Sequence, residues 1–208
     1  MKKTAFNENY RHCCNETKLD FSNQAKIISA MYEDKEASRL MSFYLCLGAT
    51  SGEAGSTTTI KTLADYGWRG SSQLTSLERK LLSTSGICSF CMLESNKIDA
   101  TLEAMDLTEN ICPVHPRAVI QHTVSKIYFK EDGKLQVDHV DQNRMQCLFR
   151  HIRNSIAHGL TYEVSDDCLL LEDRGTKDKG RSVTARILVE KQSLIDWIDV
   201  IEKGPSKS

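Results

Sequence analysis

The sequence predicts a mainly α-helical protein with a small β-hairpin embellishment, and three observations support this. Several long segments repeat apolar residues at helical spacing, only a few short runs look like strands, and no internal repeat is visible. The composition agrees with this, because 208 residues with 40% apolar and 26% charged residues are typical of a soluble globular chain. We therefore expect a single domain, residues 1–208, with its own hydrophobic core.

The first half of the chain contains most of the helical patterns. They cover Leu19–Leu47, Ile60–Tyr66, Gln73–Ser83 and the middle of Cys88–Leu107. The first of these patterns has a candidate break at Asp34. Residues 1–18 are polar and are expected to be flexible. Gly48–Thr59 is rich in Gly, Ser and Thr, which predicts a loop.

The second half adds an apolar run, a hairpin around an Asp-Gly pair, a strong helix, two strand-like runs and a last helix. In chain order these lie at Ala118–Ile127, Ile127–Val137, Val140–His158, Thr161–Asp173 with Ser182–Glu190, and Leu194–Ile201. Gly159 stands where a helix commonly ends. We therefore predict a β-rich insert over residues 159–190 and a C-terminal helix over residues 191–203.

Charge and hydropathy limit the classes of partner. Twenty-seven Lys and Arg against twenty-eight Asp and Glu give a formal charge of −1, so binding to nucleic acid would need a local basic patch. No apolar stretch approaches the roughly 20 residues of a membrane span, and the first residues lack the apolar core of a secretion signal. We expect a cytoplasmic protein that does not contact a membrane, whose eight cysteines are free thiols or metal ligands.

The end of the strongest helix carries the most informative chemistry. In the segment RHIRNSIAHG, residues 150–159, three of the four basic or imidazole groups lie off the apolar stripe. At about 100° per residue, Asn154 and His158 stand one above the other on the helix, while Arg153 lies about 140° away from His158. The long arginine side chain is needed for the two groups to converge.

These side chains suit RNA cleavage without a metal. With an unperturbed pKa of about 6.5, His158 can take a proton from a ribose 2′-hydroxyl or give one to the leaving oxygen. Arg153 can bind a phosphate with two hydrogen bonds, and Asn154 can orient the imidazole or hold a phosphate oxygen. Because one histidine does not easily act as both base and acid, a second one from a two-fold related chain predicts a homodimer. The alternative is a structural role, because Arg and His near a helix C-terminus also stabilise its dipole.

The pattern Arg153-Asn154-x-x-x-His158 at the end of an amphipathic helix resembles the motif of HEPN domains. The resemblance implies a helical bundle that dimerises with its two motifs facing each other. It also implies a metal-independent ribonuclease of a bacterial defence, toxin or abortive-infection system, with Arg153 and His158 catalytic and Asn154 supporting. An antitoxin or sensor protein is then an expected partner.

Two features depart from the family pattern. HEPN toxins that pair with a nucleotidyltransferase antitoxin often carry His-x-Tyr, whereas His158 is followed by Gly159 and Leu160, and Tyr162 comes two places too late. The β-rich insert before the last helix is also absent from a minimal HEPN bundle. The sequence therefore argues against regulation through a modified tyrosine.

A second cluster has the spacing of a structural zinc site. Cys88-x-x-Cys91 and Cys112-x-x-His115 are separated by twenty residues, as in sites whose thiolate and imidazole ligands come from two tight turns. With four protein ligands, such a zinc ion would have no open position for catalysis. The competing interpretation places Cys88 and Cys91 in a helix as small buried hydrophobic residues.

The sequence thus favours a homodimeric, metal-independent endoribonuclease that requires no cofactor for catalysis. Two alternatives stay open. One is a non-catalytic HEPN-like module that binds RNA, nucleotide or a partner protein, and the other is a zinc-stabilised interaction protein.

Overall fold

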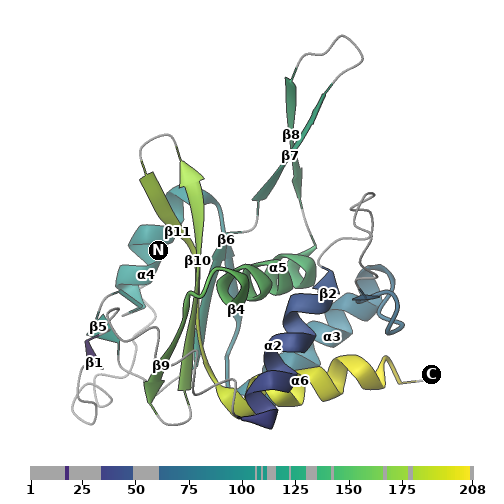
Figure 1. The fold of residues 1–208 in the computed structure, drawn as a ribbon. Coiled ribbons are helices and arrows are strands. Elements are labelled where there is room, and N and C mark those ends of the chain that lie inside the picture. The colour runs from purple at the N-terminus through teal and green to yellow at the C-terminus, as the bar shows by residue number, and fades with distance from the viewer. Residues whose placement is uncertain are drawn as a thin grey trace.

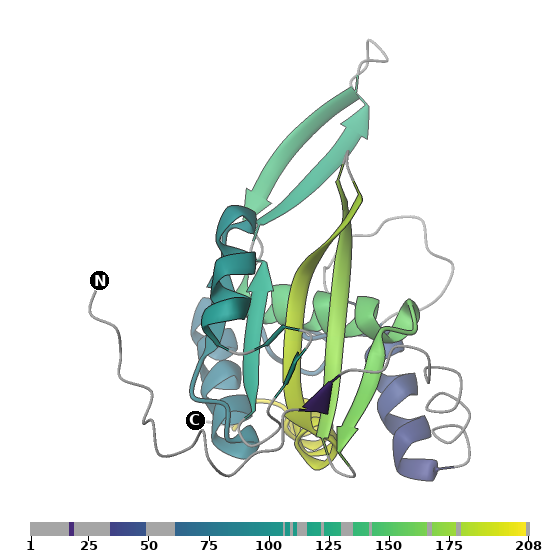
Figure 2. The same cartoon turned by 90° about the vertical axis from the view of Figure 1, so that its left-hand side faces the viewer.

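A five-stranded mixed sheet with helices on both faces forms the centre of the protein (Figure 1, Figure 2). The prediction of a mainly α-helical, HEPN-like bundle with a small β-hairpin embellishment is therefore wrong. The strands predicted as a separate insert instead form one sheet together with two earlier strands. The computed structural model describes residues 17–18, 34–48, 61–105, 107–108, 110–111, 116–121, 123–129, 135–141, 143–165, 168–177 and 180–206.

The order of the sheet brings distant segments together. Across the sheet the strands are β4 (Phe90–Leu93), β6 (Arg117–Gln121), β11 (Gly180–Glu190), β10 (Cys168–Lys177) and β9 (Thr161–Ser165). β4 and β6 are parallel, and the other neighbours are antiparallel. The two early strands are short apolar runs, which periodicity alone does not distinguish from buried helix. This explains why β4 was not predicted. It lies at the start of Cys88–Leu107, whose predicted helical middle is confirmed by the helix Ile98–Ala104.

Alternation along the strands divides the interior into two cores. On β10, Leu169 and Leu171 join the main core beneath four helices, while Leu170 joins a second core on the opposite face. On β11, Ile187 and Leu188 divide in the same way. Successive side chains of a strand point to opposite faces, so a sheet covered on both sides needs apolar residues at every position.

Among the described residues, four helices cover the main core and one covers the second. The four are α2 (Lys35–Cys46), α3 (Gly70–Ser85), α5 (Arg144–Ala157) and α6 (Lys191–Lys203), and the one on the opposite face is α4 (Ile98–Ala104), preceded by a 3-10 turn at Ser95–Lys97. The predictions for α3, α5 and α6 are confirmed. α2 confirms the end of the first predicted helix, whose earlier part, residues 19–33, lies outside the described residues.

Of two further predicted segments, one has a different secondary structure from the prediction and the other lies mostly outside the described residues. The predicted helix at 60–66 is instead the strand β3 (Lys61–Thr62), which pairs with β2 (Leu47–Gly48), followed by turns over 63–67. Residues 49–59 of the predicted loop are not described. The remaining short strands are β1 (Thr17–Lys18) and β5 (Asn110–Ile111), which pair with each other.

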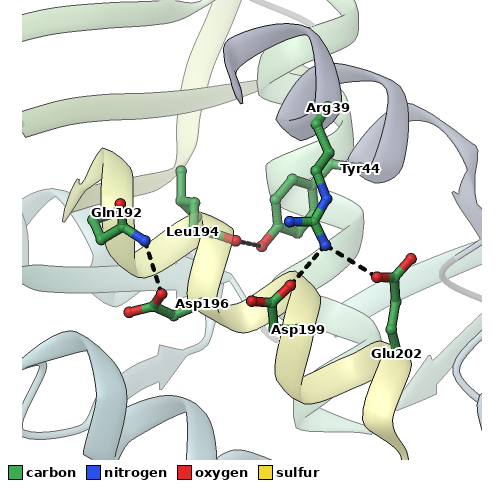
Figure 3. A network of polar contacts seen from close by, with 7 residues as sticks. All are labelled: Arg39, Tyr44, Gln192, Leu194, Asp196, Asp199 and Glu202. Carbon is green, nitrogen blue, oxygen red and sulfur yellow. Dashed lines mark hydrogen bonds and ion pairs between the residues drawn. The ribbon is translucent and has the colours of Figure 1, made fainter. Parts of the chain in front are cut away.

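Polar contacts between α2 and α6 fix the helices of the main core (Figure 3). The hydroxyl of Tyr44, which is buried, donates to the carbonyl of Leu194 at 2.8 Å. At the surface, the Arg39 guanidinium lies 2.6 Å from Asp199 and 3.1 Å from Glu202. One end of each contact is on α2 and the other on α6, so these two helices from distant parts of the chain are joined in one layer.

The predicted hairpin is confirmed as β7 (Thr123–Phe129) and β8 (Leu135–Asp141), a two-stranded antiparallel ribbon. It extends beyond one end of the five-stranded sheet (Figure 1, Figure 2). Within the described part of the chain, no helix has the length and apolar character to cross a membrane.

Candidate functional site

Local capping defines where the motif helix begins and ends. At the start of α5, the Asn143 side chain accepts a hydrogen bond from the backbone of Met145, and Gln146 reaches back to the Asn143 backbone N–H. At the end, Gly159 has φ 66°, and the N–H of Leu160 bonds to the carbonyl of Ser155 at 2.8 Å. This is a Schellman ending, for which glycine is preferred because it adopts positive φ without steric cost.

His158 is the C-cap residue of α5, and its side chain is exposed. Its imidazole makes no hydrogen bond or ion pair with a described residue. Arg153 is half-buried on another side of the helix, where its Nε donates to the carbonyl of Leu45 on α2 at 3.3 Å. Within the described residues, the side chains of Arg153, Asn154 and His158 make no hydrogen bond to one another, although the backbone N–H of His158 donates to the Asn154 carbonyl at 2.9 Å. The side chains of the first two are held by other elements.

Asn154 is held by a carboxylate from the sheet. Its Nδ2 donates to Oδ2 of Asp173 on β10 at 3.1 Å. The same oxygen lies 2.6 Å from Nδ1 of His151, which is one turn earlier on α5. Asp173 and His151 are only 3% and 1% exposed, so this contact lies between the helix and the sheet rather than at the surface.

The partners of His151 indicate which of its ring nitrogens donates a hydrogen bond and which accepts one. Nη2 of Arg150 lies 2.8 Å from Nε2 of His151. Because a guanidinium only donates hydrogen bonds, Nε2 accepts, and the ring proton is on Nδ1, from which it is donated to Asp173. Through its two ring nitrogens, His151 therefore links the buried carboxylate to the half-buried Arg150.

Opposing effects act on the pKa of Asp173. Burial alone would raise this pKa, but hydrogen bonds from His151 and Asn154, together with the charge of Arg150, hold the pKa of the carboxyl below its usual range. Asp173 is thus a buried carboxylate that stays ionised at neutral pH.

Sequence reasoning found the motif but missed Asp173 and the buried position of His151. The angular position of His151, about 100° from Ile152, places it at the border of the apolar stripe. No local pattern marks Asp173, which the sequence predicts only as the last residue of a strand. Its meeting with α5 depends on the register of the sheet.

The candidate zinc ligands are only partly described. Cys88 is exposed on a bend, and Cys91 lies half-buried in β4, so the competing interpretation of two buried cysteines in a helix is wrong. Cys112 and His115 lie outside the described residues. Elsewhere in the described part of the chain, no group of three His, Cys, Asp or Glu side chains has the arrangement of a metal site.

Comparison of the chain with family models, with curated proteins and with solved structures gives no match.

Proposed function

We propose that the protein is a metal-independent endoribonuclease whose active site is built around His158 and Arg153. The observation that carries the proposal is the end of α5, where an exposed imidazole follows a half-buried guanidinium by five residues. The sequence Arg-Asn-x-x-x-His, which resembles the HEPN motif, supports the same reaction. The support comes from the motif and its surroundings rather than from the fold, since the chain is not a mainly helical bundle.

Arg153 is suited to bind a phosphate. The bond from its Nε to the Leu45 carbonyl directs the guanidinium, while Nη1 and Nη2 make no hydrogen bond with a described residue. Two parallel N–H groups match two phosphate oxygens and would stabilise the charge that develops as the phosphorus is attacked.

His158 would transfer the proton. As base it removes the proton of the 2′-hydroxyl, whose oxygen attacks the adjacent phosphorus and forms a 2′,3′-cyclic phosphate while the 5′-oxygen leaves. The leaving oxygen needs a proton as well, and we propose that His158 of a second copy supplies it across a two-fold axis.

Cleavage assays with chelator present test this proposal. Wild type, Arg153→Ala and His158→Ala are incubated with total RNA and transfer RNA, and Arg79→Ala, an exposed arginine on α3, serves as the charge-matched control. Loss of a proton-transfer group costs on the order of 100-fold or more in rate, so cutting falls sharply in both site variants and persists in the control. Silence of the wild type on every RNA contradicts the proposal.

A binding module is the second candidate, and the free imidazole favours it. A catalytic histidine is usually oriented by a hydrogen bond to a buried acid. Among the described residues, no such partner contacts the His158 ring. In that case wild type binds RNA without cutting it, and Arg153→Ala weakens binding and lowers its salt dependence.

The resemblance also suggests a physiological setting in bacterial defence or in a toxin pair with an antitoxin or sensor. Expression of an active ribonuclease should then arrest growth, and His158→Ala should relieve the arrest at equal protein level. Growth arrest by both proteins contradicts this setting.

A further inference from the structure

The structure assigns Asp173 as a positioning residue that fixes Asn154 with its amide nitrogen inward and its carbonyl oxygen toward the motif surface. The role in the reaction depends on the proposed function, whereas the orientation of Asn154 can be tested without it. Asp173 does not reach the exposed surface, so it acts through Asn154.

An ionised carboxylate only accepts hydrogen bonds, so the group that Asn154 presents to Asp173 at 3.1 Å is its NH2. The amide is planar, and its carbonyl oxygen consequently faces away from that bond. On the side away from Asp173, Asn154 thus offers its carbonyl oxygen as an acceptor.

His158 lies where its ring can donate a hydrogen bond to the side-chain carbonyl oxygen of Asn154. It follows Asn154 by four residues on the same helix, and residues at this spacing are neighbours on one face. A carbonyl oxygen there can accept an N–H of the His158 ring and so leave the other ring nitrogen to take up a proton. Such bonds are often open in a free enzyme and close when substrate binds.

The same part of β10 also holds the turn that follows His158. The backbone N–H of Glu172 donates to the carbonyl of Leu160 at 2.9 Å. Directly after Asp173, the pairing with β11 shifts register, and bulges of this kind redirect side chains next to functional sites. The two strand residues Glu172 and Asp173 therefore hold both the Asn154 side chain on α5 and the backbone of Leu160 after the helix.

The test compares two neighbouring carboxylates. Asp173→Asn removes the charge that holds Asn154, and Glu172→Gln removes an equally buried carboxylate that faces the other side of the sheet. We expect Asp173→Asn to lower kcat by about 10- to 100-fold, as is typical of residues behind a reacting group, with KM changed less than about two-fold. Glu172→Gln should keep kcat when both rates are corrected for the folded fraction. An equal loss in both variants overturns the assignment.

A second readout does not need cleavage. In ¹⁵N-labelled wild type, the side-chain amide signals of Asn154 should be protected from solvent exchange at neutral pH, and in Asp173→Asn they should exchange at least about ten-fold faster. Signals that are identical in the two proteins overturn the inference. If wild type cuts no RNA, the proposed function fails, and this measurement alone decides whether Asp173 positions Asn154.

Discussion

Glu172 and Asp173 are neighbours on β10, yet their carboxylates lie on opposite faces of the sheet. Glu172 accepts from Nε of Arg186 at 2.6 Å and also pairs with Arg174, while Arg186 donates in addition to the carbonyl of Leu107. Asp173 instead faces α5 and His151. Each of these two buried carboxylates therefore has its own hydrogen-bonding partners, as buried charged groups require.

The first prediction concerns pH and Asp173. Its pKa is lowered by folding, so its ionised form stabilises the protein above the unfolded pKa of about 3.9, and this contribution is lost as pH falls through the folded pKa. At pH 7 we expect Asp173→Asn to lower the free energy of unfolding by about 1–3 kcal/mol. Urea unfolding from pH 7 to pH 3 checks this, because the difference between the two proteins should shrink below about pH 4. A difference that is constant with pH contradicts the prediction.

The second prediction ranks the two contacts between α2 and α6 (Figure 3). Tyr44→Phe removes a buried hydroxyl that donates to Leu194 and should cost about 1 kcal/mol of unfolding free energy. Arg39→Ala removes an exposed ion pair, which water and salt screen, and should leave stability unchanged within error. Urea unfolding of both variants at low and high salt gives the ranking, and a larger loss in Arg39→Ala would reverse it.

The third prediction concerns the end of the motif helix. Gly159 has φ 66°, which costs a residue with a Cβ about 1–2 kcal/mol, although asparagine tolerates this region better than alanine. We therefore expect stability to fall in the order glycine, Gly159→Asn, Gly159→Ala. Thermal unfolding of the three proteins measures the order. Equal stability of Gly159→Asn and Gly159→Ala would mean that the positive φ at this position does not cause the loss of stability.

The fourth prediction concerns the bulge beyond Asp173. A Cβ at Gly175 would lie 2.9 Å from Cγ2 of Thr184 on β11, so either the Thr184 side chain or one of the two strands must shift. Gly175→Ala should cost about 1–3 kcal/mol, and Thr184→Ser, which removes that methyl group, should recover much of the loss. A double-mutant cycle of unfolding free energies gives the coupling, and purely additive effects would exclude this contact as the cause.

The limits of sequence-based prediction follow from the range of the interactions involved. α5 could be predicted, because its apolar stripe and Gly159 are local signals, but its predicted start at Val140 lies in β8. β4 and β6 could not be distinguished from buried helix, because a short apolar run carries no period. The sheet itself depends on pairings such as Ala118 with Ile187, which are far apart in the chain.

The candidate site likewise combines a local sequence pattern with a contact between distant parts of the chain. Arg153, Asn154 and His158 form a local pattern that can be recognised in the sequence, but their activity stays a prediction. Asp173 joins Asn154 only when β10 pairs in the correct register against α5, and nothing within a few residues of either position encodes that meeting.

The strand order has a consequence for synthesis on the ribosome. β11 lies between β6 and β10, so β6 and β4 have no route into the sheet until Glu190 has left the exit tunnel. Until then, their apolar residues stay exposed to solvent or bind other segments transiently. Chains stopped before β11 are therefore expected to aggregate or to be captured by chaperones. β4 can pair with β6, and β9 with β10, before β11 emerges, but the two pairs can join into one sheet only after it.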